Sequence, residues 1–537
     1  MTDGPKILMV GWDGATFDII GPMVAAGRLP NIAQLMKNGA WGRMESTIPA
    51  LTPVAWTSMS TGVNPGKHAI FDAMHFSTEK RKISFVNASM RKVKPLWSLL
   101  SDVGKKVGVM NVPVTYPPDE VNGFVIPGMF TPESADNFMY PPTLKEELAS
   151  KFGPYAIECT QSASPAAYLK AIIEIDVDFR EKVAAYLMET REWNFFFCAF
   201  MSSDRAQHFF WQYLDPSHPQ HAKYGDAIAT VYEKMDESLG RLIEKAGSDA
   251  TIIMVSDHGS GPLKTAFFLN FWLQKNGYLF LHRDFKSALK RSSALLPKMS
   301  RVLKKLFGQG RGSSGVTESQ KTDINSFPEL IDWEHTSAFS EGVAGGIFIN
   351  PNVVGSDRYD DIVEGIRTGL LALKDDHGNR VVQAVYRRDE IYRGEHTRLA
   401  PDLIVVCEGG FQVIAPNEFL LFKKDFENNL FLSHRWSGRH EKDGIFVAHG
   451  PSIRKNGEMG GCSIVDVAPT ILHLMREKVP AYMDGKVLTE VMHASFLAEY
   501  PVRYSSEDHT LDAKIETLSS EEDQQISERL RDLGYLE

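Results

Sequence analysis

Seven side chains in the sequence are of the types that hold divalent metal ions or attack phosphorus. Three are aspartates that end or follow apolar runs, three are histidines, and one is a threonine before a proline: Asp13, Thr52, Asp204, His208, Asp257, His258 and His440. Histidine with carboxylate suits Zn²⁺ and also holds Mn²⁺ or Fe, whereas sites for Mg²⁺ or Ca²⁺ are nearly all oxygen. The set is large enough for two divalent cations, and we predict Zn²⁺, with Mn²⁺ as the alternative.

Two such ions point to a displacement reaction at phosphorus. Metal ions that lie about 4 Å apart clamp the attacking and the leaving oxygen of an in-line displacement. A threonine hydroxyl is a poor nucleophile at neutral pH, but coordination to a metal lowers its pKa and gives an alkoxide without a dedicated general base. Thr52 is therefore the expected nucleophile.

Each of these residues also has a simpler explanation. Asp204 and His208 are four positions apart, a spacing that is common in capping and solvent-exposed pairs on helices. His440 precedes an apolar run and is of a kind often found on the surface, and Thr52 taken alone is typical of a helix cap. The conjunction of all seven residues is what favours a metal centre.

A helix is expected directly after Thr52. The sequence ALTPVAWTSMSTG has Pro53 at the first helical position, where its fixed φ and missing N–H are favourable, and Gly62 after the last turn. A threonine at the cap lies at the positive end of the helix dipole, beside N–H groups that have no partner inside the helix. That environment favours the negative oxygens of a phosphoryl group.

Short apolar runs indicate the strands that position the other residues. They are KILMVGWD, KKVGVMNVP, NFFFCAF, ATIIMVSDHG, GGIFIN, DLIVVC and GIFVAHG, and each is rich in Val, Ile or Phe, as buried strands are. Helical segments lie between several of them. The alternation predicts an α/β fold with a mostly parallel central sheet and helices on both faces. Asp13, Asp204 and Asp257 then lie at the carboxyl ends of strands, where such sheets bind ligands.

Composition excludes several classes of protein. The chain has 537 residues, 43% of them hydrophobic and 23% charged, with a formal net charge of -10; this indicates a large core and argues against a nucleic-acid binder. The four cysteines form no CxxC pair, and the N-terminus has no signal-like apolar core, so a cytoplasmic location is expected. No apolar run is long enough to span a bilayer.

We expect one catalytic domain over residues 1–500, with two added segments. Residues 282–325 are rich in Lys and Arg and end in a Gly/Ser stretch, which predicts an inserted lid or membrane-surface element. Within it, residues 298–307 have the apolar spacing of a basic amphipathic helix, for which packing on the core is the alternative to membrane contact. Residues 505–537 form an acidic tail with a short helix that Ser520 caps and Gly534 ends.

The order of the motifs resembles that of the alkaline phosphatase superfamily: WDG, then ALTPVAWTSMSTGVNPGKHAI, DxxxH, SDHG and a late SGRH. Within that superfamily, the chain is most similar to the type I phosphodiesterase and nucleotide pyrophosphatase branch. The likeness extends through VPVTYPPDEVNGFVIPG, APDLIVV and VDVAPTILHLM to RLRDLGYLE, which is nearly the whole chain. The resemblance implies an alkaline-phosphatase-like sheet and phosphoryl transfer through a covalent phosphothreonine.

The resemblance also assigns roles to the seven residues. Thr52 matches the nucleophile of the family. The ligands of the metal that binds the nucleophile match Asp13, Asp257 and His258, and those of the second metal match Asp204, His208 and His440. The chain departs from the family in KHAIFDAMHF, which has no counterpart of the asparagine that holds phosphoryl oxygens in nucleotide pyrophosphatases. TPVAW also has neither the Cys or Ser nor the Arg of a sulfatase, which argues against a sulfatase.

We therefore predict a metal-dependent phosphoesterase that acts on a small phosphorylated molecule, at a phosphodiester or pyrophosphate bond. The alternative among enzymes is a phosphomonoesterase or a phosphonate hydrolase of the same superfamily. The alternative outside enzymes is an inactive metal-binding regulatory protein.

Overall fold

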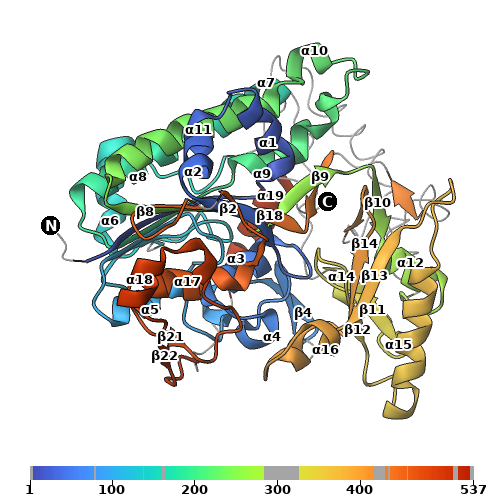
Figure 1. The fold of residues 1–537 in the computed structure, drawn as a ribbon. Helices are drawn as coiled ribbons and strands as arrows, with labels where there is room; N and C mark the ends of the chain where they lie inside the picture. Colours follow the sequence, from blue (N-terminus) through green and yellow to red (C-terminus); the bar gives the residue numbers. More distant parts are fainter. Residues whose placement is uncertain are drawn as a thin grey trace, which may run out of the picture.

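The computed structural model describes residues 4–77, 80–136, 138–159, 164–282, 326–414, 430–432, 436–455, 457–511 and 518–532. Among these residues the centre is a nine-stranded sheet (Figure 1). Its order is β19 (Gly457–Glu458), β2 (Ala40–Glu45), β18 (Asp443–His449), β8 (Ala250–Val255), β1 (Lys6–Trp12), β7 (Phe195–Phe200), β5 (Val107–Met110) and β6 (Gly123–Ile126), with β20 (Cys462–Ser463) beside β2. Strands β8, β1, β7, β5 and β6 are parallel. The predicted α/β class with a mostly parallel central sheet is confirmed.

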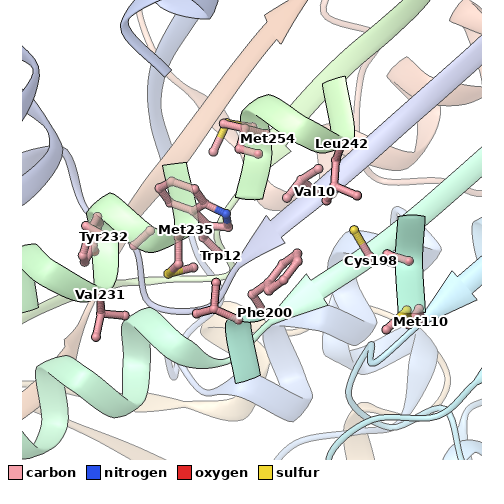
Figure 2. Packing of buried hydrophobic residues seen from close by; sticks show 14 of the residues in the cluster. Val10, Trp12, Met110, Cys198, Phe200, Val231, Tyr232, Met235, Leu242 and Met254 are labelled. Atoms are coloured by element: carbon pink, nitrogen blue, oxygen red, sulfur yellow. The ribbon is translucent and has the colours of Figure 1, made fainter. Parts of the chain in front are cut away.

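Helices cover both faces of this sheet, as predicted (Figure 1). One face carries α1 (Phe17–Ala25), α2 (Pro30–Asn38), α6 (Thr143–Phe152), α8 (Arg180–Thr190) and α11 (Ala227–Ala246), and the other carries α3 (Thr52–Thr61), α5 (Leu96–Asp102) and α17 (Val467–Leu474). Figure 2 shows Trp12, Phe200 and Met254 of the strands in the same cluster as Met235 and Leu242 of α11. The buried residues of α11 recur at intervals of three and four, because a helix presents one stripe to the sheet.

A second lobe is built from the chain between β9 (Gly259–Pro262) and β17 (Gly438–Glu441) (Figure 1). One of its sheets has the order β11 (Ala338–Ser340), β12 (Gly346–Ile349), β14 (Leu403–Cys407), β13 (Val382–Arg387), and the other β15 (Phe411–Ile414), β10 (Thr265–Phe268), β16 (Phe431–Leu432). Around them lie α12 (Leu269–Lys275), α14 (Ser326–Leu330), α15 (Ser356–Leu371) and α16 (Arg388–Ile391). The runs GGIFIN and DLIVVC, expected beside the other strands, are β12 and β14 of this antiparallel sheet. An apolar run indicates burial but not which sheet the strand joins.

Shorter α-helices and strands of the described chain are α4 (Pro65–His68), β3 (Met74–Ser77), β4 (Lys82–Phe85), α7 (Pro165–Ala171), α9 (Ser202–Phe210), α10 (His221–Tyr224), β21 (Val479–Pro480), α18 (Ala494–Glu499) and β22 (Tyr504–Ser505). The predicted insertion lies almost wholly outside the described residues, and residues 298–307 are among those omitted. In the part of the chain that is described, every helix is too short or too polar to cross a membrane.

The C-terminal tail contains α19 (Ser520–Asp532). The Ser519 hydroxyl accepts the N–H of Glu522 at 3.2 Å, and the Glu522 carboxylate accepts the N–H of Ser519 at 2.8 Å. This reciprocal pair is a capping box, so the cap is Ser519 and not Ser520. Gly534 lies outside the described residues. The helix packs into a cluster that includes the segment around Thr52: Leu51, Val54, Ile526 and Leu530.

Candidate active site

The three predicted aspartates meet because their strands are neighbours. β1 lies between β7 and β8, and all three strands run in the same direction. Asp13 directly follows β1, Asp257 follows β8 by two residues, and Asp204 lies in the first turn of α9, after β7. Parallel strands end at the same edge of a sheet, so the three carboxylates are brought to one edge.

A tight turn after Asp13 is held from several sides. Gly14 has φ +65, and a Cβ there would lie 3.1 Å from the Asp204 carboxylate, so both the conformation and the close approach require glycine. The N–H of Gly14 donates to the Asp257 carboxylate at 3.2 Å. Gln207 and Ser260 donate to the Gly14 carbonyl, each at 2.9 Å. The turn thus ties the ends of β1, α9 and β8–β9 together.

The first half of the site consists of Asp13, Asp257 and His258. The Nε2 atom of His258 lies 3.2 Å from Asp257 Oδ2 and 3.5 Å from Asp13 Oδ1. All three side chains are fully buried. This grouping matches the one that the family resemblance implied.

The second half of the site consists of Asp204, His208 and His440. His208 Nε2 lies 3.1 Å from Asp204 Oδ1, and His440 Nε2 lies 3.4 Å from the same oxygen. The Nε2 atoms of the two histidines are 2.9 Å apart. His440 reaches this position because β17 pairs antiparallel with β9, which places His440 opposite Ser260. The structure therefore joins the helical Asp204–His208 pair to a histidine more than two hundred residues away.

The two halves are adjacent. A ring nitrogen of His258 lies within 4.8 Å of ligand atoms of Asp204 and His440, and His258 also groups in this way with Asp13 and Asp257. The rings of His258 and His440 stack with centroids 3.7 Å apart. The side chains predicted for two ions thus converge on one continuous site.

All three histidines turn the same ring atom toward the site. Their Nδ1 atoms contact backbone carbonyls: His208 that of Gly438 at 2.7 Å, His258 that of Gly259 at 2.9 Å, and His440 that of Ala50 at 3.0 Å. A carbonyl accepts only, so Nδ1 carries the proton and each Nε2 presents a lone pair to the site. Two bare lone pairs would repel at the 2.9 Å between the Nε2 atoms of His208 and His440, so this spacing requires a proton or a metal cation between the two nitrogens.

The carboxylates fit cations for a similar reason. The oxygens Asp13 Oδ1 and Asp257 Oδ2 are buried and accept no hydrogen bond. Burial, and then the charge of Asp257, raise the pKa of Asp13 well above its ordinary value. Burial raises the pKa of Asp257 in the same way, and the charge of Asp204 adds to it. Buried carboxylates of this kind require opposite charge, which divalent ions supply.

The His258 imidazole supplies no positive charge to offset the carboxylates of Asp13 and Asp257. Burial, and then the neighbouring His440, lower the pKa of His258 well below its ordinary value, so its imidazole is neutral. Burial alone would raise the pKa of Asp204, but the adjacent His208 lowers it well below the ordinary value. The set of neutral imidazole and ionised carboxylate suits Zn²⁺ or a similar ion.

Thr52 lies beside the first half. It is the first residue of α3, with Leu51 as the cap, so the helix begins one residue earlier than the sequence predicts, and Pro53 is its second residue. Gly62 ends the helix with φ 69, as expected. The Thr52 hydroxyl is 3.3 Å from His258 Nε2. It lies at the N-terminus of α3, where the first-turn N–H groups favour anions.

Trp56 was not identified from the sequence. Its indole N–H donates to Asp13 Oδ2 at 2.8 Å, which leaves Oδ1 for a ligand. The ring reaches Asp13 only because Gly11 has no side chain: a Cβ there would lie 2.4 Å from the ring. Trp56 follows Thr52 by four residues on α3, and that spacing alone does not reveal which carboxylate the indole contacts.

Two other histidines, His434 and His449, are near His440 in the sequence. His449 ends β18, pairs with Ile252 near the start of β8, and contacts the carbonyl of Asn38, so it lies at the opposite edge of the sheet. His434 lies outside the described residues. His440 is therefore the histidine that the structure brings to Asp204 and His208, and its role as a metal ligand stays a prediction.

A cavity of about 240 Å³ opens next to the site. Its walls include Ala50 and Leu51 before Thr52, His440 itself, and strands β13, β14 and β15 of the second lobe. The cavity therefore lies between the central sheet and the lobe.

Comparisons with known proteins agree with this architecture. The curated human protein ectonucleotide pyrophosphatase/phosphodiesterase family member 5 is 23% identical over 167 residues, which is 30% of this chain and 30% of that protein. Murine ectonucleotide pyrophosphatase/phosphodiesterase 5 has a TM-score of 0.51 at 15% identity, over 91% of this chain and 100% of that chain, and another structure of it, inactive, is a complex with AMP. Phosphonoacetate hydrolase from Sinorhizobium meliloti 1021 has a TM-score of 0.52 at 13% identity, over 86% and 94% of the chains. The family model for type I phosphodiesterase / nucleotide pyrophosphatase matches residues 7–420, and this chain therefore belongs to that family.

Proposed function

We propose that the chain is a two-metal hydrolase that cleaves a phosphodiester or pyrophosphate bond through a phosphothreonine on Thr52. Membership of the phosphodiesterase family supports a phosphoesterase in general. The observation that carries the proposal is the Thr52 hydroxyl, 3.3 Å from His258 Nε2, an atom that itself lies 3.5 Å from Asp13 Oδ1 and 3.2 Å from Asp257 Oδ2.

Two divalent ions would be held by the two halves of the site, Asp13–Asp257–His258 and Asp204–His208–His440. When bound, they supply positive charge that lowers the pKa of a hydroxyl and stabilises phosphoryl oxygens. Zn²⁺ is proposed first, because three of the six side chains are imidazoles with Nε2 lone pairs directed inward.

The protein's own groups orient the reaction. Backbone carbonyls fix the three imidazole rings, and Trp56 fixes the Asp13 carboxylate. Helix α3 holds the Thr52 oxygen at its N-terminus, where the N–H groups and the dipole favour a negatively charged phosphoryl group in line with that oxygen. The covalent step forms the Thr52 Oγ–P bond and breaks the bond from phosphorus to the leaving oxygen, and water then cleaves the phosphothreonine.

We propose a small phosphorylated molecule as the substrate, which the AMP complex of the murine neighbour supports. A cytoplasmic location is proposed on the four cysteines, all of which are free thiols. A phosphonate hydrolase is the second candidate, because the fold is also shared with phosphonoacetate hydrolase. Contact of residues 298–307 with a membrane stays a proposal from the sequence.

The test uses the full chain and two esters of one aryl alcohol, bis(p-nitrophenyl) phosphate and p-nitrophenyl phosphate. We expect a strong chelator to abolish hydrolysis and Zn²⁺ or Mn²⁺ to restore it, with the diester cleaved faster. Mass spectrometry of acid-quenched enzyme should find the phosphate on the peptide that contains Thr52. Activity that survives exhaustive removal of metal would contradict the two-metal proposal, and faster cleavage of the monoester would favour a phosphomonoesterase.

A further inference from the structure

Helix α19 is packed into the body of the protein, close to the candidate active site. Its Ile526 and Leu530 are buried in the same cluster as the residues at the start of α3. The carboxylate of Asp523 accepts the N–H of Phe85 at 3.1 Å, which fixes the first turn of the helix on strand β4. The helix therefore has a defined position from which its side chains can reach inward.

One side chain of α19 reaches a buried carboxylate. Arg529 is 5% exposed, and its Nη2 donates to the carbonyl of Thr131 at 2.6 Å. Its Nε lies 3.2 Å from Oε2 of Glu158, and the other oxygen of Glu158 lies 3.3 Å from Nη2 of Arg205. Glu158 therefore joins an arginine of α19 to an arginine of α9.

Arg205 directly follows Asp204 on α9. Besides Glu158, it pairs with Asp176 through Nη1, and the other oxygen of Asp176 accepts Nη2 of Arg180 at 2.8 Å. The Arg205 side chain is thus held by two carboxylates. Because Asp204 and Arg205 belong to the same turn of α9, a displacement of Arg205 would move the carboxylate that both histidines of the second half contact.

Glu158 is the part of this buried group that depends on α19. Asp176 pairs with two arginines that lie outside α19, whereas the ion pairs of Glu158 within the described ranges are those with Arg205 and Arg529. A buried ion pair that loses one partner leaves an uncompensated charge, which is strongly unfavourable. Without the Arg529 guanidinium, Glu158 would have to turn toward water or rearrange around Arg205.

We propose that Arg529 is a positioning residue for the second half of the site. Through Glu158 and Arg205, it holds the turn of α9 that places Asp204. The inference rests on the proposed function, because it concerns the ion that the second half would hold. The first half should be insensitive to Arg529, since Asp13 and Asp257 follow strands of the central sheet.

Zinc binding by the full chain tests the proposal. Arg529→Met keeps a long side chain and removes the charge. A zinc titration against a competing chromophoric chelator gives an affinity for each ion, and the ion that is lost in His440→Ala is the one at the second half. We expect this ion to bind about tenfold more weakly in Arg529→Met, at the lower end of what supporting contacts give, and the other ion to stay within about twofold.

Hydrogen exchange of the metal-free chain is a second readout, which does not depend on zinc. Amide protection reports local opening of a segment. In Arg529→Met, we expect the amides of α9 to exchange at least about threefold faster than in wild type, while those of β1 and β8 keep their wild-type rates.

Two further variants test the route through Glu158. Glu158→Gln keeps the shape of the side chain and removes its charge, so it should weaken the same ion as Arg529→Met. The double variant should be no weaker than either single variant, because residues that act through one contact are not additive. Arg529→Lys keeps the charge and should recover part of the affinity. If Arg529→Met does not fold, Glu158→Gln and Arg529→Lys decide.

Arg91→Met is the matched control. Arg91 is also buried in an ion pair, with Asp119 at 2.9 Å, and its Nε donates to the carbonyl of Val93. Its loss should lower thermal stability but leave both zinc affinities at the wild-type values.

The outcomes separate this inference from the proposed function. Unchanged zinc affinities and unchanged exchange of α9 in Arg529→Met would overturn the inference and leave the two-metal proposal intact. Equal weakening of both ions in Arg529→Met and in Arg91→Met would overturn it in favour of general destabilisation, and additive losses in the double variant would exclude the route through Glu158. If wild type binds no zinc, the proposed function fails, and the exchange of α9 alone decides whether Arg529 holds that helix.

Discussion

The two halves of the site are built in different ways. Asp13, Asp257 and His258 come from the ends of two neighbouring central strands, are fully buried and lie beside Thr52. Asp204 and His208 come from one helix, and the third member, His440, is partly exposed on the short ribbon β17–β9. A ligand set held by the middle of a sheet is more rigid than one that depends on a two-stranded ribbon.

From this difference we expect the two halves to differ in how tightly they bind an ion and in how they respond to changes in the second lobe. The first half contacts Thr52, the proposed nucleophile, and we expect it to hold its proposed ion tightly, because its residues cannot move without disturbing the central sheet. The second half includes a residue that follows the second lobe in the chain, and His440 also lines the cavity. The second half should therefore respond to changes in the lobe, and the first half should not.

The largest effect is expected at Thr52, the proposed nucleophile. Thr52→Ala removes the oxygen that would form the proposed covalent intermediate, so kcat should fall by at least about a thousandfold, as when other nucleophiles are removed. Phosphoenzyme should be undetectable by mass spectrometry. Thr57→Ala, one turn later on the same helix, is the matched control, because the Thr57 hydroxyl donates to the Pro53 carbonyl and not to the site. A similar loss of kcat in both variants would show that activity depends on the integrity of helix α3 and not on the Thr52 oxygen.

The next effect compares the halves directly. Asp257→Ala and His440→Ala should each lower bound zinc from about two ions per chain to about one, measured by elemental analysis after dialysis. The loss of kcat/KM should be the greater in Asp257→Ala by about tenfold or more, because in the proposed mechanism the ion at the first half would lower the pKa of the Thr52 hydroxyl. If either variant still binds two zinc ions per chain, the residue replaced in that variant is not a metal ligand.

A smaller effect is expected when the hydrogen bond from Trp56 to Asp13 is removed. Trp56→Phe removes the hydrogen bond to Asp13 but keeps a ring beneath the site. Loss of such a supporting contact typically costs about tenfold to a hundredfold in metal affinity, so activity should need more Zn²⁺ to reach half its maximum. Trp97→Phe is the control, because Trp97 donates to Asp119 outside the site. An unchanged zinc requirement in Trp56→Phe would mean that the sheet alone orients Asp13.

The smallest effect is expected at His449. His449→Gln should leave zinc content and kcat/KM within about twofold of wild type, because this side chain lies at the other edge of the sheet and contacts Asn38. A loss of zinc in this variant comparable to that in His440→Ala would contradict the assignment of the second half.

Much of the fold followed from local patterns. The strands β1, β7 and β8 are short, continuous apolar runs, and their burial leaves Asp13 and Asp257 at strand ends wherever the sheet forms. The start of α3 was predicted to within one residue, because Pro53 and Gly62 restrict the backbone themselves. The cap of α19 was misplaced by one residue, since two consecutive serines offer the same side chain and only the partner, Glu522, distinguishes them.

Other features had no local signal. The second lobe was not expected, because β12 and β14 look like central strands when only hydrophobicity is considered. The contacts of Trp56, Gln207 and Ser260 with the turn at Asp13 and Gly14 join residues far apart in the sequence. Tryptophan, glutamine and serine are common in helices and strands. These three residues contact the turn only because the fold places them beside it.

The sequence by itself determined the chemistry that is available: two carboxylates at strand ends, a third in the helix that follows a strand, three histidines and a threonine at a helix start. These features depend on residue type and on the backbone preferences of a few neighbours. Only the tertiary structure decided which of them meet. The pairing of β1 with β7 and β8 brings Asp13, Asp204 and Asp257 to one edge, and the pairing of β17 with β9 brings His440 and not His449 to Asp204. The physical reason is that strand order and ribbon pairing arise from burial of whole surfaces, which no single segment encodes.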